Sequence, residues 1–265
     1  WVIDWKRAGN AIQITHDPSD AMNPVWSPIG DKIAFTSYRK GNADVYVINS
    51  NGGGLEKPLL ESPGNETVEA WSPDGKYIVY LSGQDNFQDI YALPLSGDGK
   101  PIPVVTGPFR RDEPQVSYDG NWLAYTSDSS GGTFQVFTVA FPKGDQKKQI
   151  STNGGGQPRW SRNGKELFYR EGNQIMVVDF NAGKPGSPHI LFAAPGSAIA
   201  NNPTRHQLAV STDGQRLLFR VPPVFGNAED AGTQSVAPAV DPGLRGGLGF
   251  GRGGGRRGGG RAGAY

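Results

Sequence analysis

One twelve-residue pattern recurs five times along the chain, and no other feature of the sequence constrains the fold as much. Each copy has an apolar residue, Ser, any residue, usually Asp or Asn, and then Gly, and an alternating apolar segment follows. The copies are WSPIGDKIAFTS from Trp26, WSPDGKYIVYLS from Trp71, VSYDGNWLAYTS from Val116, WSRNGKELFYRE from Trp160 and VSTDGQRLLFRV from Val210. Successive copies start 45, 45, 44 and 50 residues apart, and a period of this length is typical of repeat architectures.

Each repeat predicts four short strands. One strand precedes the Trp or Val, and an alternating segment such as KIAFTS follows the Gly. A polar turn then leads to a third segment such as DVYVIN, and a Gly or Pro turn leads to a fourth such as KPLLES. Four strands every 40–50 residues are typical of a β-propeller blade. We therefore predict an all-β fold of four-stranded antiparallel blades.

The two ends of the repeat region each match half of a blade. Residues 1–15 match the last two strands of a repeat, and residues 207–221 match only the first two. The prediction is thus four complete blades plus an N-terminal and a C-terminal half-blade within residues 1–222. The halves can combine into one composite blade, or the intact ring has six or more blades and the chain, which starts at Trp1 inside a strand-like segment, is a piece of a longer protein.

The repeated turn is interpreted as scaffold. Asp-Gly or Asn-Gly supplies positive φ at little cost and joins two strands as a hairpin, and the Ser hydrogen-bonds nearby backbone. The Trp residues are expected to wedge between neighbouring blades. The structural repeat residues are Trp26, Gly30, Trp71, Asp74, Gly75, Asp119, Gly120, Trp160, Gly164, Asp213 and Gly214.

The charge is unevenly distributed. The chain has a formal net charge of +1, but residues 243–265 carry five Arg and no acid, so the rest of the chain has a charge of −4. Residues 223–265 are predicted to be a linker and a disordered Gly/Arg-rich tail. The tail is expected to be solvated, with binding of RNA or another anionic polymer as the alternative. No apolar run approaches the roughly 18 residues needed to span a membrane, so no transmembrane segment is expected.

The repeat resembles the TolB-like, WD40-like (PD40) β-propeller family, whose blades carry a WSPDG turn followed by strands like KIAFTS and DVYVIN. The resemblance covers roughly residues 1–222. Residues 149–180 also resemble the last blades of C-terminal propellers attached to bacterial serine/threonine kinases and winged-helix regulators. The resemblance implies a sensory or interaction module.

The sequence predicts no catalytic residue, metal site or cofactor. There are no Cys and three His, and no HExxH motif is present. The chain also lacks a GxSxG nucleophile elbow and the HRD and DFG motifs of kinases. We therefore expect no enzymatic activity in this chain, although a catalytic domain can belong to a missing part of the parent protein.

The loops that enter each blade are the predicted binding surface. In propellers such loops line one mouth of the central channel, and the candidate residues are polar or charged. The candidates for binding a protein or peptide partner are Asn23, Glu69, Arg110, Arg111, Asp112, Glu113, Gln157 and Gln207.

These observations favour a non-catalytic ligand- or protein-binding propeller of a bacterial envelope or signalling protein, in the periplasm or otherwise outside the cytoplasm. One alternative is the propeller of a larger enzyme, either a serine/threonine kinase or a prolyl-oligopeptidase-type peptidase. Another is a nucleic-acid-associated protein that acts through its Arg/Gly tail.

Overall fold

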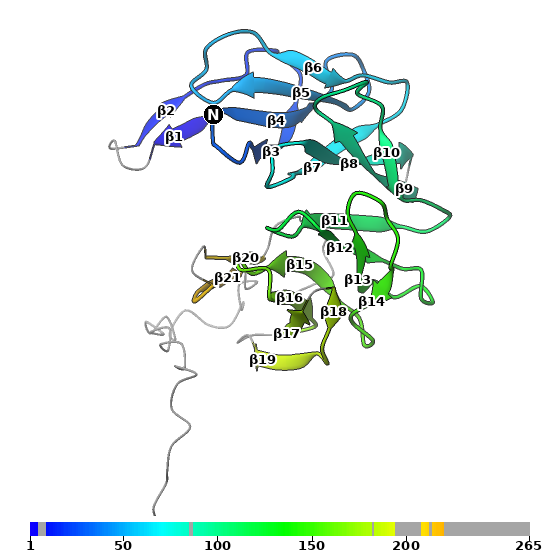
Figure 1. The fold of residues 1–265 in the computed structure, drawn as a ribbon. Coiled ribbons are helices and arrows are strands. Elements are labelled where there is room, and N and C mark those ends of the chain that lie inside the picture. Colours follow the sequence, from blue (N-terminus) through cyan, green and yellow to red (C-terminus); the bar gives the residue numbers. More distant parts are fainter. Residues whose placement is uncertain (5–8, 85–86, 182, 194–207, 212–213, 220–265) are drawn as a thin grey trace, which may run out of the picture. The chain divides into compact units, whose positions relative to one another are not determined.

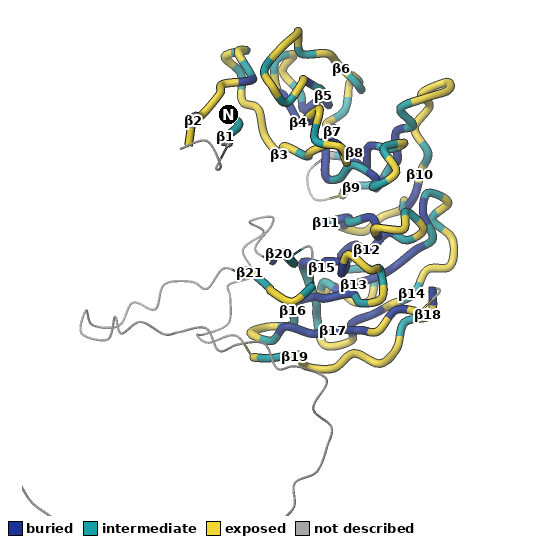
Figure 2. The backbone as a smooth tube through the Cα atoms, turned by 60° about the vertical axis from the view of Figure 1, so that its left-hand side comes forward, coloured by how far each residue is buried: buried dark blue, intermediate teal, exposed yellow. Residues whose placement is uncertain are grey.

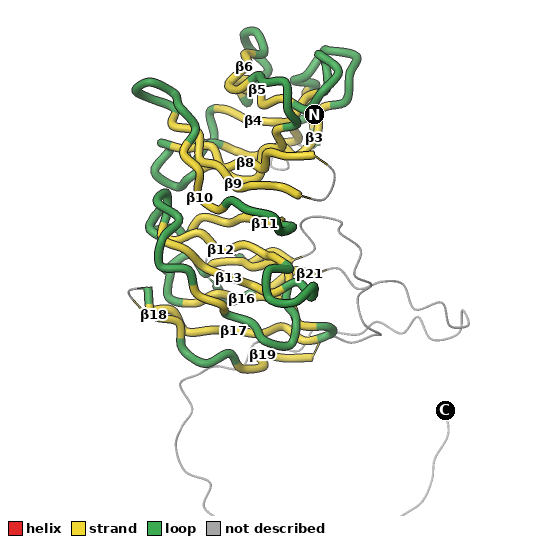
Figure 3. The backbone as a smooth tube through the Cα atoms, turned by 90° about the vertical axis from the view of Figure 1, so that its right-hand side faces the viewer, coloured by secondary structure: helices red, strands yellow, loops and turns green. Residues whose placement is uncertain are grey.

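The computed structural model describes residues 1–4, 9–84, 87–181, 183–193, 208–211 and 214–219. Every regular element in these residues is a β-strand, and none of them is a helix (Figure 3). The described part accordingly contains no helix that is long and apolar enough to cross a membrane. The all-β prediction is therefore confirmed. Residues 220–265, which include the predicted tail, lie outside the described part, as do Gln207 and Asp213.

Four sheets follow one another along the chain, and we call them blades 1 to 4 (Figure 1). Blade 1 contains β3 (Ala21–Trp26), β4 (Lys32–Ser37), β5 (Asp44–Asn49) and β6 (Lys57–Leu60). Blade 2 contains β7 (Glu66–Trp71), β8 (Tyr77–Gln84), β9 (Phe87–Pro94) and β10 (Ile102–Val105). Blade 3 contains β11 (Arg111–Val116), β12 (Trp122–Ser127), β13 (Gln135–Ala140) and β14 (Lys148–Gln149). Blade 4 contains β15 (Gly156–Trp160), β16 (Glu166–Glu171) and β17 (Gln174–Asn181), and β17 pairs with both β18 (Lys184–Pro185) and β19 (His189–Ala193).

The half-blades form two further sheets of two strands each. β1 (Val2–Asp4) pairs with β2 (Asn10–Ile12), and β20 (Leu208–Val210) pairs with β21 (Leu217–Phe219), all antiparallel. Within the described residues these two sheets do not pair with each other, so the composite blade is not formed. The prediction of four complete blades with a half-blade at each end is confirmed.

Each hydrophobic core lies between two successive sheets. In β8, Ile78 and Tyr80 pack in a cluster with residues of blade 1, whereas Val79 and Leu81 pack in a cluster with residues of blade 3. The middle strands are therefore buried on both faces (Figure 2), which explains why their sequences are almost continuously apolar. Burial of one such Leu or Ile side chain contributes about 2 kcal/mol.

The repeated Trp residues differ in burial. Trp160 is 4% exposed, and its ring meets that of Phe180 edge-on with centroids 4.8 Å apart. Trp71 is half-buried, but Trp26 is 52% exposed, so the expectation that it wedges between blades is wrong. Trp160 packs in one cluster with Ala124 of the second strand of the preceding blade. The sheet that precedes blade 1 contains only β1 and β2 among the described residues, and these correspond to the outer two strands of a blade. Within this described part, Trp26 therefore has no second strand of a preceding blade to pack against.

The turn motif is a hydrogen-bonded scaffold built around its Ser. In blade 2, Ser72 Oγ donates to Asp74 Oδ1 (2.6 Å) and accepts from the backbone N–H of Tyr77 (2.9 Å), while Gly75 N–H donates to the Ser72 carbonyl. Gly75 has φ 76°, which costs Gly little. Burial acts to raise the pKa of Asp74, but hydrogen bonds from Ser72 and the Lys76 N–H outweigh it and lower the pKa.

The same turn occurs in the other repeats with matching contacts. The motif Ser hydroxyl donates to the acid or amide before the Gly in blades 3 and 4, and in blade 1 to Asp31, which follows the Gly. In all three it accepts a backbone N–H from the next strand. The motif Ser residues of the four blades are Ser27, Ser72, Ser117 and Ser161, none more than 6% exposed. The scaffold interpretation of Asp74 and its equivalents follows from these contacts.

Replacing the buried hydroxyl tests the role of the turn. Ser72→Ala leaves the Tyr77 N–H and the Asp74 carboxylate each without one partner, so we expect the free energy of unfolding to fall by about 1–3 kcal/mol. Urea titration followed by tryptophan fluorescence measures it. Ser96→Ala, at an exposed position, is the matched control and is expected to change stability by less than about 0.5 kcal/mol. Equal losses in the two variants would contradict the assignment.

Candidate functional site

The first strands of successive sheets contact one another and form the shared inner layer of the blades. β3 contacts β7, β7 contacts β11, β11 contacts β15, and β15 contacts β20. Each first strand of blades 1 to 4 contains a β-bulge against its second strand. The register shifts lie between Met22 and Val25, Val68 and Ala70, Asp112 and Gln115, and Gly156 and Arg159. Bulges at this position re-aim side chains and are frequent beside functional sites.

Three bulges hold a residue other than Gly in the left-handed region. Asn23, Glu113 and Gln157 have φ of 50°, 56° and 55°, and among the described residues the one further non-Gly case is Gln146. Such a conformation costs about 1 kcal/mol or more for an ordinary residue. These three residues and Glu69, the bulge residue of blade 2, were all predicted from the sequence as site residues. Repeated strain at equivalent positions makes these residues the candidates for a functional site.

A charged layer connects the bulges of three blades. We give this name to Glu69, Glu113 and Arg159. Glu113 Oε2 accepts a hydrogen bond from the backbone N–H of Gln157 at 2.6 Å, which joins blade 3 to blade 4. Gln157 itself is 7% exposed, and its Oε1 is buried without a hydrogen-bond partner.

Arg159 is the buried cation of this layer. It is 8% exposed, and its Nε donates to the Leu208 carbonyl (2.8 Å), which ties blade 4 to β20. Burial lowers the pKa of Arg159, while the negative charges of Glu113 and Glu69 act to raise it. The layer therefore gathers opposite charges from blades 2, 3 and 4 in a largely buried place.

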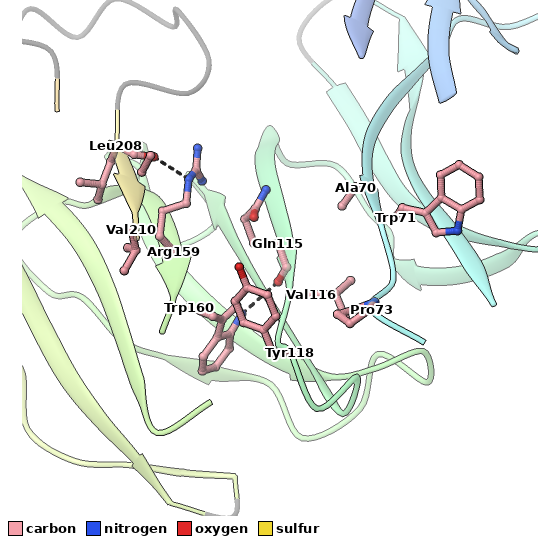
Figure 4. Close-up of a pocket in the computed structure, with 11 residues that line it drawn as sticks. Ala70, Trp71, Pro73, Gln115, Val116, Tyr118, Arg159, Trp160, Leu208 and Val210 are labelled. Atoms are coloured by element: carbon pink, nitrogen blue, oxygen red, sulfur yellow. Dashed lines mark hydrogen bonds between the residues drawn. The ribbon is translucent and has the colours of Figure 1, made fainter. Parts of the chain in front are cut away.

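A cavity of about 330 Å³ borders the charged layer on the side of the hairpin turns that follow the inner strands, and Arg159 belongs to both. Figure 4 shows its labelled residues, which come from β7, β11, β15 and β20 and from the turns that follow β7 and β11. The aromatic members are Trp71, Tyr118 and Trp160, the polar members are Gln115 and Arg159, and the others are Ala70, Pro73, Val116, Leu208, Ala209 and Val210. Trp160 Nε1 donates to the Gln115 carbonyl at 3.1 Å, so the indole is fixed across the blade boundary. Apolar walls with few polar groups are typical of ligand pockets.

The entrance loops lie at the opposite end of β11 from this cavity. Arg110 directly precedes β11, whereas Tyr118 lies two residues past its last residue, and six strand residues span about 17 Å. Arg110 is exposed, and its guanidinium lies 5.0 Å from the centroid of the Phe134 ring. Asp112 Oδ1 accepts from the Glu113 N–H and thereby supports the bulge.

Arg111 is buried within the scaffold. It is 4% exposed, and its Nη1 lies 3.0 Å from Asp89 Oδ1. The same nitrogen also lies within hydrogen-bond distance of three backbone carbonyls, those of Gln88, Gly107 and Phe109. Its guanidinium thus holds the loop before β11 against β9.

The structure brings together part of the predicted site. Glu113 and Gln157 are joined by a hydrogen bond, and Glu69 and Glu113 both act on the charge of Arg159. Arg110 stays at the rim, and Asn23 lies in the equivalent bulge of blade 1. Sequence reasoning missed the cavity residues Gln115, Tyr118 and Arg159. The signal available was the column directly before each repeat's Trp or Val, which reads Val25, Ala70, Gln115, Arg159 and Ala209. The described residues contain no group of three or more His, Cys, Asp or Glu that could hold a metal ion.

Comparison with known proteins identifies related chains. A model described as the TolB beta propeller domain (PD40) matches residues 7–190. The Tol-Pal system protein TolB of Syntrophus aciditrophicus is 42% identical over 45 residues, which are 17% of this chain and 10% of that protein. The uncharacterized peptidase YuxL of Bacillus subtilis is 33% identical over 79 residues, which are 26% of this chain and 12% of that protein.

A solved structure agrees with these matches at the level of the fold. TolB from Acinetobacter baumannii superimposes with a TM-score of 0.57 at 21% identity, over 77% of this chain and 49% of that one. The chain thus spans about a tenth of the curated relatives it matches and about half of this structure.

The bulge of blade 3 yields a test. Glu113→Ala removes the acceptor of the Gln157 N–H and a negative charge that acts on Arg159, so we expect the free energy of unfolding to fall by about 2–4 kcal/mol. Gln146→Ala is the control, because Gln146 has nearly the same positive φ but is exposed. Chemical denaturation measures both. Glu113→Gln keeps an acceptor oxygen, so its free energy of unfolding is expected to fall less than that of Glu113→Ala. If Glu113→Ala lost no more stability than Gln146→Ala, the stabilising link between blades 3 and 4 would be refuted.

Proposed function

Because the chain belongs to the family of TolB β-propeller domains, whose model matches residues 7–190, we propose that it is a non-catalytic module that binds a protein or peptide outside the cytoplasm. The observation that carries the proposal is the cavity on the inner strands. It takes one or more residues from each of blades 2, 3 and 4 and from β20, so it exists only when these sheets are assembled.

The cavity has the size and chemistry to accept an apolar side chain of a partner. Its volume of about 330 Å³ lies at the lower end of the range for ligand pockets. Aromatic and Pro walls supply apolar contact, and Tyr118, 47% exposed, can donate its hydroxyl at the edge. Aromatic residues in such positions are common anchors of protein interfaces. The charged layer, which shares Arg159 with the cavity, and Arg110 at the opposite end of β11 then add polar selectivity.

The extracytoplasmic location is part of the proposal. The matched relative is a protein of the Tol-Pal system, which supports placing this chain in the bacterial envelope. A signalling role beside a kinase or winged-helix domain stays a prediction from the resemblance of residues 149–180. The Arg/Gly tail lies outside both the described residues and the family match, so its binding to RNA has no support from either.

A second candidate is the propeller of a larger peptidase. The 79-residue match to YuxL favours it, since that protein is described as a peptidase. In such a peptidase the cavity and the charged layer would bind or orient the peptide substrate, and the catalytic groups would belong to another domain.

Peptide selection on the intact chain tests the binding function. Peptides selected from a displayed random library are measured by titration of the intrinsic tryptophan fluorescence, with Trp71 and Trp160 in the cavity as reporters. We expect Tyr118→Ala to weaken binding at least tenfold, about 1.4 kcal/mol, because an aromatic anchor is removed. Tyr38→Ala, which removes a similarly exposed Tyr of blade 1, is expected to bind like the unmodified chain.

The same titrations separate the two ends of the inner strands. Loss of binding in Arg110→Ala but not in Tyr118→Ala would move the site to the rim. Equal affinity in all variants would refute binding at either end. Selected peptides that are recovered cleaved would contradict a non-catalytic module.

A further inference from the structure

A hydrogen bond from the loop entering each following blade recurs at three blade junctions. In each case a residue of the third strand, paired with Ser37, Ser82 or Ser127 of the second strand, offers a side-chain oxygen that accepts a backbone N–H from that loop. The pairs are Asp44 with Ser62, Asp89 with Gly107, and Gln135 with Gly154, at N···O distances of 3.1, 3.0 and 3.1 Å. We number these junctions 1, 2 and 3. Their shared geometry allows them to be compared as copies of one site.

Junctions 2 and 3 carry no net charge. At junction 2, Asp89 is neutralised by Arg111, the first residue of β11, whose side chain is 3% exposed. At junction 3 the acceptor is the neutral amide of Gln135. Arg111 lies five residues before Val116, and the equivalent position, five residues before Trp160, is Gly155. A Cβ at Gly155 would come within 2.6 Å of Ser151 Oγ, so this position is closely packed.

Junction 1 has a second carboxylate where junction 2 has the guanidinium. Glu66 is the first residue of β7 as Arg111 is of β11, and both lie five residues before the Trp or Val of the repeat. Asp44 is 1% exposed and Glu66 is 3% exposed. The two acids flank one residue, because Ser62 donates its N–H to Asp44 Oδ1 and its Oγ–H to Glu66 Oε1 (2.7 Å).

No cation compensates these charges among the described residues. The cations of the neighbouring loop, Arg39 and Lys40, form ion pairs with Glu56 and Glu61 instead. Glu66 Oε2 is buried and has no hydrogen-bond partner, although Oε1 accepts from two hydroxyls. A buried carboxylate oxygen without a partner is unfavourable unless a positive charge lies beside it.

We propose that junction 1 binds a divalent cation of the Ca²⁺ type, which takes the place that Arg111 has at junction 2. The available donors are all oxygens: the carboxylates of Asp44 and Glu66 and the hydroxyls of Ser62 and Ser82. An all-oxygen set favours a hard cation over Zn²⁺ or Cu²⁺, and two carboxylates balance its charge. The cation fastens blade 1 to blade 2. This inference is independent of the proposed binding function.

Calcium-dependent thermal unfolding of the full chain tests the site. After treatment with a chelator, Ca²⁺ at a hundredfold excess over its Kd is expected to raise the Tm by about 5–10 °C. Tb³⁺ provides a second readout, because Tyr80 lies within electrostatic reach of Glu66 and can sensitise its luminescence. Ca²⁺ is expected to displace Tb³⁺ and quench this emission.

Two variants at Glu66 and one control separate the site from other acids. Glu66→Gln is expected to lose both the Tm shift and the Tb³⁺ signal. Glu66→Arg recreates the Asp89–Arg111 arrangement and is expected to unfold at a Tm that Ca²⁺ does not change. Glu61→Gln removes an acid of the same loop that binds Tyr46 and Lys40, and it is expected to keep the full shift. A Tm unaffected by Ca²⁺ in the unmodified chain, or an equal shift in Glu66→Gln, would overturn the proposal.

Discussion

Packing between successive sheets is the interaction on which the rest of this structure depends. A middle strand such as β8 sends alternate side chains into two different cores, one shared with the blade before it and one with the blade after it. No blade therefore has a complete core of its own, and the stability of each depends on its neighbours. The same constraint brings the first strands together, since adjacent sheets that pack on each other also place their first strands in contact. A shared inner layer follows directly from the way the chain buries its apolar residues.

The features that could be predicted from the sequence are those that local chemistry determines. Segments 32–37, 44–49 and 122–127 are strands with the predicted bounds, because their apolar side chains fill a core on either face. The Ser-x-Asp-Gly turn was also readable, since its hydrogen bonds join residues at most five positions apart. The exposure of Trp26 was not predictable in this way, because it depends on which strands lie in the adjacent sheet. The fourth strand of blade 3 is short, with only Lys148–Gln149 paired.

The site was only partly predictable, because its contacts join residues about 45 positions apart. The bulge residues Glu113 and Gln157 stood out as polar residues at equivalent places, but their mutual hydrogen bond crosses from one blade to the next. Arg159 resembles any Arg in a strand until the structure shows it buried near Glu69 and Glu113. Likewise, Asp44 and Glu66 are unremarkable in the sequence, and only the fold places both against Ser62.

The repeats also show how one backbone supports different chemistry at equivalent positions. The column before the repeat's Trp or Val holds Ala in blade 2, Gln in blade 3 and Arg in blade 4, while the strands that carry it pair in the same way. The two cores on either side of each blade provide the stability, so the inner strands can accept bulges, positive φ and buried charge. Selection for stability alone would favour removing such features, because each costs free energy. Their presence in the inner layer, where blades 2 to 4 and β20 meet, is the physical argument behind the proposal that this layer recognises a partner.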